Sequence, residues 1–412
     1  MQTPISGDAG AGAAELARVA AFDLRALDAE FLDNPYPTYH LLRRVDPVHR
    51  CPDGSYFLTR YADVLGVYRD RRMSSDKKVE FKPKFGDGPL YTHHTTSLVF
   101  NDPPLHTRVR RLISAAFTPR SLAASEPRIV EVVEGLLDRA EEAGRMDLIG
   151  DFAFALPVEV VCDMLGVPRG DRSPFRDWSL AILGALEPAI SDEQLATGNQ
   201  AVTDFRAYLR ALVDERRRQP RDDLISTLLA GEPDGEKLTE EELLQNCIFL
   251  LNAGHETTTH LIGNGIGALM EHPDQLRLLR DDPSLIDSAI EEFLRFESSN
   301  QLGNRRVAED AEVGGVPMPA GTLITLCIGA ANRDSDQFPD PDRLDITRSS
   351  NKHLAFAAGH HVCAGNTLAR MEGRIAIGTL LRRFPNLRRD GAFVRGGRAR
   401  FRGYRSYPVA LS

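Results

Sequence analysis

Cysteine is scarce in this chain, with five residues among 412, an odd number scattered along the sequence. This usage excludes a disulfide framework and is typical of a reducing compartment, so we expect a cytoplasmic protein. The first twenty residues lack a basic start followed by an apolar core, so we expect no secretion signal. An apolar run of about 18 residues, the length that spans a membrane, is also missing, so we expect no membrane association.

Positive charge is not in excess either. Lys and Arg number 50 against 59 Asp and Glu, which gives a net charge of −9. This balance excludes a nucleic-acid binder that relies on bulk positive charge. Hydrophobic residues make up 42% and charged residues 26%, so the chain is not mostly disordered and is large enough to bury a cofactor.

Periodicity divides the chain into a few regions. We expect a loose Ala/Gly-rich tail over residues 1–20 and a single domain over residues 21–412, because no repeat or Gly/Ser linker interrupts it. The pattern is helical from 103 to about 295 and alternates as in β-strands after 305. The sequence therefore predicts a mainly α (α+β) fold, a helix-rich domain with small peripheral β-sheets.

Three shorter segments carry their own signals. A Pro-Asp-Gly turn between alternating runs predicts a hairpin over residues 47–60. Residues 77–100 lack periodicity and predict a long loop, which in compact proteins is often a lid or binding segment. The basic segment 394–411 predicts another β-hairpin.

One long helix is interrupted by polar residues. Thr239 and Glu242 form a capping box, and the helix that follows is predicted to run about thirty residues to His272. In its middle stands Ala-Gly-His-Glu-Thr-Thr, where buried polar groups need partners. Gly254 removes side-chain bulk where a ligand could approach, and Thr257 can hydrogen-bond to a carbonyl one turn earlier. A solvated face is the alternative, although the flanking segments look buried.

The most informative segment is Phe356-Ala-Ala-Gly359-His-His361-Val-Cys363-Ala-Gly365. A lone cysteine between glycines indicates a tight turn in which backbone N–H groups point at the sulfur. The helix that follows adds its positive end, and both effects stabilise a thiolate. A single thiolate suits a metal that brings its own equatorial ligands, and haem iron is the obvious one.

Two other interpretations of this segment stay open at the level of residues. Free cysteines are most often buried and inert. A His/Cys zinc site is also possible, from His93 and His94 and from His353, His360 and His361 with Cys363, although the paired ligand spacing of structural zinc is missing.

The cysteine segment resembles the haem-binding loop of the cytochrome P-450 monooxygenases, F-G-x-G-x-[HR]-x-C-x-G. The resemblance implies that Cys363 is the axial thiolate of haem b and that His361 hydrogen-bonds a haem propionate. Phe356, Gly359 and Gly365 would complete the cofactor-binding loop. Ala357 stands where the family usually has glycine, and we expect haem ligation to be unaffected.

The polar interruption is similar to the family's oxygen-binding A-G-x-[DE]-T motif. The resemblance implies that Ala253 and Gly254 line the oxygen site. Glu256 and Thr257 would form the acid–alcohol pair that organises water and delivers protons.

Further basic residues match the family's propionate partners. His106 and Arg110 are four residues apart and share a helix face, as in the family's H-x-x-x-R. Arg305 and Arg306 are adjacent in a predicted strand and point to opposite faces. Counting along the family's usual strand favours Arg305 as the third propionate partner.

Glu292-Phe-Leu-Arg295 matches the family's E-x-x-R, which by itself would be an ordinary helix-surface salt bridge. With Arg343 farther along the chain, the resemblance implies a buried structural triad that supports the fold and retains haem.

The resemblance implies a hydroxylase that inserts one atom of O2 into a small hydrophobic substrate. Electrons would come from NAD(P)H through a ferredoxin reductase and a ferredoxin, and the enzyme would be a monomer. Two other classes stay open: a haem-thiolate peroxygenase, dehydratase or oxidative-coupling enzyme, and a non-catalytic haem carrier or sensor.

Basic residues near one helix could meet the acidic ferredoxin: Arg108, Arg110, Arg111 and Arg120. By family analogy the substrate pocket is lined by residues 82–100, 170–195 and 298–303, Ala253 and the turn near Phe401. The first of these segments carries Lys82, Lys84, His93, His94 and Ser97, which suggests an acidic group on the substrate unless the lysines simply face solvent.

Overall fold

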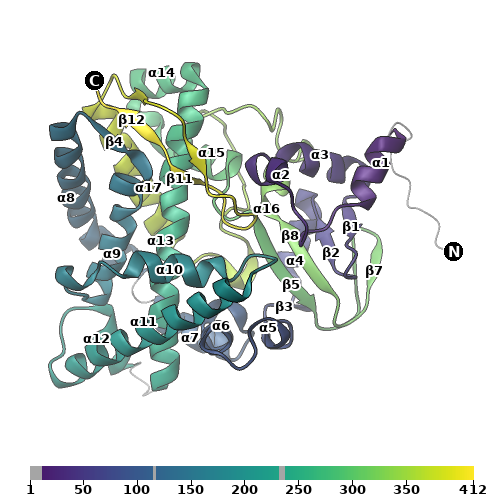
Figure 1. Ribbon diagram of the computed structural model, residues 1–412, viewed down its shortest axis with the longest axis horizontal. Coiled ribbons are helices and arrows are strands. Elements are labelled where there is room, and N and C mark those ends of the chain that lie inside the picture. Colours follow the sequence, from purple (N-terminus) through teal and green to yellow (C-terminus); the bar gives the residue numbers. More distant parts are fainter. Residues whose placement is uncertain (1–11, 115–116, 232–236) are drawn as a thin grey trace.

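The computed structural model describes residues 12–114, 117–231 and 237–412 (Figure 1). Long helices occupy one side of the molecule, and a small mixed sheet with short helices occupies the other. The predicted mainly α fold with small peripheral sheets is confirmed.

The central element is α13 (Glu240–Glu271), and its predicted start and end are confirmed. Thr239 caps it, because its hydroxyl accepts from the Glu242 amide while the Glu242 carboxylate accepts from the Thr239 amide. Pro273 begins the next helix and ends this one. A Cβ at Gly265 would lie 2.8 Å from Phe293, so the glycine lets a neighbouring helix approach closely.

Two apolar cores pack against α13. The upper core in Figure 1 joins it to α8 (Pro119–Ala143), α9 (Ala155–Leu165), α14 (Pro273–Asp281), α15 (Ile286–Phe296) and α17 (Asn366–Arg383). The lower core adds α7 (Leu105–Ser114), α10 (Phe175–Gly184), α11 (Asp192–Arg218) and α12 (Leu224–Ala230). Among the described helices, none is long and apolar enough to cross a membrane.

The main sheet has the order β1 (Val48–Arg50), β2 (Tyr56–Leu58), β8 (Leu323–Cys327), β5 (Leu302–Val307), β3 (Met73–Ser74). Strand β2 pairs with β8 in parallel, and the other pairs are antiparallel. The hairpin predicted over residues 47–60 is confirmed as β1 and β2. Around this sheet lie α2 (Ala29–Asp33), α3 (Tyr36–Val45), α4 (Tyr61–Arg69) and α16 (Ile328–Ala331).

The predicted C-terminal hairpin is confirmed only in part. Strands β10 (Val394–Arg395) and β11 (Tyr404–Ser406) pair with each other, but the last strand β12 (Pro408–Ala410) does not continue that hairpin. It pairs instead with β4 (Arg145–Asp147) and β9 (Arg388–Arg389). A further small hairpin joins β6 (Ala311–Val313) to β7 (Val316–Met318).

The prediction of a long loop over residues 77–100 is wrong. This segment forms α5 (Lys78–Phe85) and α6 (Pro89–Thr96). The sequence hides α6 because its buried positions include His93, His94 and Thr95, so no apolar stripe marks the inward face.

The prediction of a loose tail over residues 1–20 is wrong for residues 13–20, which form a helix. Residues 1–11 lie outside the described part of the chain. Helix α1 (Ala13–Ala20) buries Val19, and Glu15 forms an ion pair of 2.6 Å with Arg44 on α3. The helix is amphipathic, but its small residues resemble a loose tail in composition.

Candidate functional site

Cys363 lies in the loop that precedes α17. Its amide donates to the Phe356 carbonyl over 3.0 Å, which joins the two ends of the loop. Gly359 has a φ of +71°, and a Cβ there would lie 2.2 Å from the Tyr68 carbonyl oxygen, so only glycine fits. The Asn366 side chain donates to the Cys363 carbonyl over 2.6 Å where the helix begins.

Ala357 has a φ of +57°, a left-handed conformation that costs about 1–2 kcal/mol for a residue with a Cβ. The family's glycine would avoid this strain. The departure from the family pattern therefore strains the backbone at Ala357, while the hydrogen bond from the Cys363 amide to Phe356 is formed.

The predicted stabilisation of a Cys363 thiolate is present but too small in the protein alone. Burial raises the pKa of the thiol, and the Gly365 amide and the charges of Arg110 and Arg370 lower it without cancelling that effect. The thiol is therefore protonated at neutral pH. A metal that binds cysteine displaces this proton, so ligation and deprotonation would occur together.

A group of hydrogen-bond donors faces this loop from α7 and β5. The rings of His106 and His361 lie 4.0 Å apart, and the Nε2 atom of each is buried without a partner. Burial, with the charge of Arg305 acting in the same direction, lowers the pKa of His106 to about 4 and that of His361 to about 2. Arg110 donates to the Val362 carbonyl over 2.8 Å.

Arg305 is exceptional among the buried arginines of the described chain. It donates to the Asn304 carbonyl and lies over the Tyr68 ring, but it forms no ion pair with a carboxylate. Arg306 points the other way and pairs with Glu80 at 3.4 Å, as strand alternation predicts. The other buried arginines all pair with carboxylates: Arg172, Arg216, Arg295, Arg333 and Arg402.

These donors fit the carboxylates of a haem. Buried cations and imidazoles without acceptors are costly, and two propionates beside His106, His361, Arg110 and Arg305 would satisfy them. Among the described residues, the carboxylate beside them is that of Asp102, which already accepts from the Ser74 hydroxyl and the Ser75 amide.

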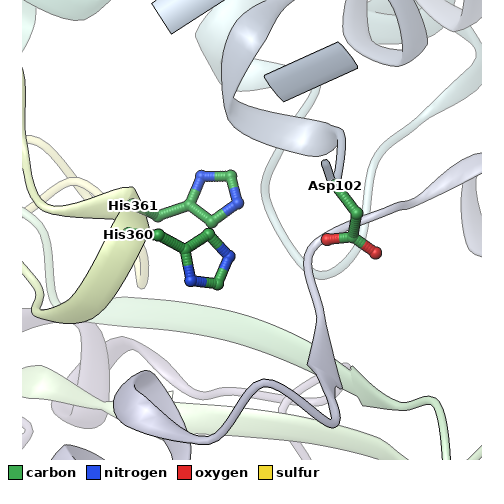
Figure 2. A group of neighbouring side chains, drawn as sticks. All are labelled: Asp102, His360 and His361. Carbon is green, nitrogen blue, oxygen red and sulfur yellow. The ribbon is translucent and has the colours of Figure 1, made fainter. Parts of the chain in front are cut away.

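The zinc site considered from sequence is not assembled as predicted. His353 bonds to Glu291 at 3.2 Å. His360 and His361 instead approach Asp102, and the ligand atoms of these three lie within 4.8 Å of one another (Figure 2). Because Asp102 is already engaged and His360 is exposed, we assign His361 to the group of donors rather than to a metal.

Helix α13 is buried along most of its length but opens in the middle. Ala253 is exposed and Thr257 is partly exposed, while Asn252, His255 and Thr258 are buried. The Thr257 hydroxyl donates to the Ala253 carbonyl over 3.0 Å, which is the predicted bond to the preceding turn. A small opening lined by a hydroxyl therefore interrupts an apolar helix.

Gly254 has a different role from the one predicted. A Cβ at this position would lie 2.8 Å from the Val161 side chain on α9, so the glycine serves helix packing. From sequence, we expected a ligand in the space beside Gly254. Sequence alone does not show that Val161 fills this space.

Glu256 is buried and does not stand alone. It forms an ion pair with Arg398 and lies 3.7 Å from the Nε2 atom of His260. Burial raises the pKa of Glu256, but the neighbouring His260 ring and the charge of Arg398 outweigh it, and the pKa lies below its ordinary value. Its Oε2 atom is buried without a partner.

The Glu292–Arg295 pair is fully buried, with two contacts of 2.8 Å. The predicted third member is wrong: the Arg343 side chain is exposed, and only its carbonyl accepts from Arg295. Arg348 occupies that place, with its Nε 3.2 Å from Glu292. The chain turns between the two arginines, so spacing alone does not identify the inward one.

Sequence reasoning missed Glu372, which is buried on α17 against α13. Burial raises the pKa of this carboxyl to about 8, although a hydrogen bond with Thr258 lowers it. A single acidic residue in an otherwise apolar helical stripe was the available signal.

The site thus combines one thiol that could bind a metal, a group of donors that forms no ion pair with a carboxylate among the described residues, and an opening with a hydroxyl. The family model described as Cytochrome P450 matches residues 56–387. The chain is 44% identical to vitamin D(3) 25-hydroxylase of Pseudonocardia autotrophica, over 87% of this chain and 88% of that relative. It is 41% identical to the biotin biosynthesis cytochrome P450 of Bacillus subtilis, over 87% and 91%.

Among solved structures, P450BioI in complex with hexadec-9Z-enoic acid ligated acyl carrier protein matches with a TM-score of 0.89 and 39% identity. The match covers 93% of this chain and all of that one. Motifs, geometry and these relatives agree over most of the sequence, and the chain belongs to the cytochrome P450 family of monooxygenases.

Proposed function

We propose that this cytochrome P450 hydroxylates a small hydrophobic substrate with O2, using haem b bound to Cys363. The proposal rests on the hydrogen-bond donors beside the Cys363 loop that have no carboxylate partner among the described residues. The two propionates of haem would supply the missing acceptors. His106, Arg110, His361 and Arg305 would hold the haem propionates. A haem iron with a cysteine ligand supplies the oxygen activation, because thiolate donation favours cleavage of the O–O bond.

The residues of α13 would control water and protons. Thr257 donates its hydroxyl proton to Ala253, so its oxygen can accept a hydrogen bond from water in the opening. Glu256 is ionised and keeps one oxygen without a partner among the described residues, so it can accept a hydrogen bond from water and orient it. The charge of Arg398 would keep this carboxylate ionised, so that it orders water rather than holds a proton.

Electrons would come from a ferredoxin that is reduced by an NAD(P)H-dependent flavoprotein. Arg108 pairs with Glu242, and Arg110 donates to the Val362 carbonyl. Arg111 and Arg120 are exposed, so charge reversal at these two positions tests the docking surface. Charge reversal to Glu at either position should lower ferredoxin-driven reduction and leave peroxide-driven turnover unchanged. Equal loss of both activities would contradict the docking surface.

The relatives do not indicate one substrate class for this chain. One is a vitamin D(3) 25-hydroxylase, and another is a biotin biosynthesis cytochrome P450. The pocket would be lined by α5, α6, the region after α10, Ala253 and residues near 300 and Phe401. The acyl carrier protein complex of P450BioI adds a carrier-bound substrate as a candidate. We further propose a cytoplasmic monomer whose catalytic domain spans residues 21–412.

The first test is the absorption spectrum of the purified holoenzyme, reduced and exposed to carbon monoxide. A strongly red-shifted Soret band supports thiolate ligation by Cys363, and a band at the histidine-like position contradicts it. NADH consumption with a surrogate ferredoxin, coupled to a hydroxylated product, separates a monooxygenase from a peroxygenase, a coupling enzyme or a haem carrier. Thr257→Ala should divert about tenfold more of the NADH into peroxide, because proton delivery is impaired.

A further inference from the structure

Lys84 and Arg400 are inward-facing cations without a carboxylate partner. In the described part of the chain, the Lys84 ammonium donates to the Glu187 carbonyl over 2.6 Å and lies over the Phe85 ring. Arg400 donates to the carbonyls of Leu186 and Leu302 and to the Asn304 side chain. These acceptors are all uncharged, unlike those of the buried arginines that pair with Asp or Glu.

Glu187 lies between the two cations and only partly compensates them. Its Oε2 atom accepts from the amides of Ala399 and Arg400, at 3.0 and 3.3 Å. Its Oε1 atom is buried without a partner. The group therefore holds two positive charges against one negative charge, and one positive charge is left uncompensated. Burial and the charge of Arg400 lower the pKa of Lys84 to about 8, although the charge of Glu187 acts in the opposite direction.

Both cations keep unused hydrogen-bond donors. An ammonium has three N–H groups and a guanidinium has five, whereas the recorded bonds use one and three of these. Two donors remain on each side chain. A carboxylate has the geometry and the single charge that such a pair of donors recognises.

The two cations converge from different parts of the proposed pocket wall. Lys84 lies on α5, Glu187 follows α10, and Arg400 lies in the segment between β10 and β11 (Figure 1). That segment runs beside residues 299–301, where the Gln301 amide donates to the Arg400 carbonyl over 2.8 Å. Lys82, two residues before Lys84, is exposed and pairs with Asp87, so it faces solvent instead.

We propose that Lys84 and Arg400 bind the carboxylate of a substrate that is otherwise apolar. The proposal rests on the proposed P450 function and deepens it by naming the substrate class. One uncompensated positive charge matches a monoanion better than a phosphate dianion. The carboxylate would fix one end of the substrate and leave an apolar part for the opening at Ala253 and Thr257.

The test uses the holoenzyme and two matched pairs of ligands: tetradecanoic acid with tetradecanol, and naphthylacetic acid with naphthylethanol. Binding is followed by the spin-state shift of the haem spectrum and, independently, by equilibrium dialysis. The wild-type protein should bind at least one acid about tenfold more tightly than its alcohol. Arg400→Gln and Lys84→Met should each weaken acid binding about tenfold to a hundredfold and alcohol binding less than twofold.

Two controls separate charge recognition from damage to the fold. Lys84→Arg keeps the charge and should retain the preference for the acid, and Lys82→Met removes an exposed charge and should change nothing. Equal weakening of acid and alcohol, or no preference in the wild type, would overturn the proposal. Loss of haem from Arg400→Gln would also overturn it, because the cation would then belong to the haem site. A missing red-shifted Soret band in the wild type would instead defeat the proposed function.

Discussion

Two clusters of buried polar residues differ in how completely they are satisfied. In the first, the Glu292 carboxylate accepts from Arg295, Arg348, the Asp345 amide and the Asn351 side chain. In the second, His106, His361 and Arg305 bring donors together without a carboxylate partner among the described residues. A complete network stabilises the fold, whereas an incomplete one indicates a ligand that the chain does not supply.

The contrast also separates two kinds of buried charge. Breaking a satisfied pair leaves a charge that nothing can compensate, so its removal should affect folding. Removing an unsatisfied cation relieves a cost in the protein alone and should affect binding. Substitutions at Arg295 and Arg305 test this distinction directly, and substitutions at Glu372 and Ala357 measure the cost of a buried acid and of backbone strain.

Arg295→Ala should lower the free energy of unfolding by about 3–5 kcal/mol, because the buried Glu292 carboxylate loses its bidentate partner. Urea unfolding monitored by circular dichroism measures the change. Arg343→Ala is the matched control, since that side chain is exposed, and should change stability by less than about 0.5 kcal/mol. If Arg295→Ala does not fold, Arg295→Lys provides the measurement. Equal effects at positions 295 and 343 would contradict the assignment of the inward arginine.

Arg305→Gln should weaken haem binding about tenfold to a hundredfold, which corresponds to the loss of one charged hydrogen bond. Haem transfer to apomyoglobin measures the release rate. Arg306→Gln removes a cation from the adjacent position, whose partner is Glu80, and should leave haem retention unchanged. A larger effect at 306 than at 305 would reverse the choice made from strand alternation.

Glu372→Gln should flatten the dependence of stability on pH. The folded-state pKa of about 8 lies above the ordinary value of 4.5, so folding takes up a proton between these values. Stability of the wild type therefore falls as pH rises from about 4.5 to 8, by at most about 1.4 kcal/mol per pH unit. Urea unfolding at pH 5 and pH 8 should show the variant gaining relative stability at the higher pH. The exposed Glu142→Gln should behave as the wild type, and parallel curves for Glu372→Gln would show that Glu372 titrates normally.

Ala357→Gly should raise the free energy of unfolding by up to about 1 kcal/mol, because glycine adopts a positive φ without strain. Thermal unfolding of the holoenzyme measures the shift, with an unchanged carbon monoxide spectrum as the control. A decrease in stability would show that the strain at Ala357 is offset by the greater freedom of glycine in the unfolded chain.

The sequence predicted much of the fold where local chemistry acts strongly. The capping box at Thr239 and Pro273 placed both ends of α13, and the hairpin turn placed β1 and β2. It failed for α5 and α6, because buried polar residues such as His94 conceal the inward face. The path of β12 was also missed, since strand pairing between distant segments leaves little trace in local sequence.

For the site, sequence placed the motif residues but not their partners. The cysteine loop and the α13 motif are short contiguous segments, so their residues can be recognised from local spacing alone. Arg398 and Arg348 escaped notice because they reach Glu256 and Glu292 across long stretches of chain. Gly254 was predicted to make room for a ligand, because only the packed structure shows that the Val161 side chain lies beside it.

The sequence by itself determined the family, the position of the proposed haem-ligand cysteine and the start and end of the central helix. These follow from residues close together in the chain, whose spacing constrains turns, caps and helix faces. The tertiary structure decided which charges are paired and which are left open. That distinction depends on contacts between distant segments. It separates the Glu292 network, which the fold completes, from Arg305, Lys84 and Arg400, which form no ion pair with a carboxylate among the described residues.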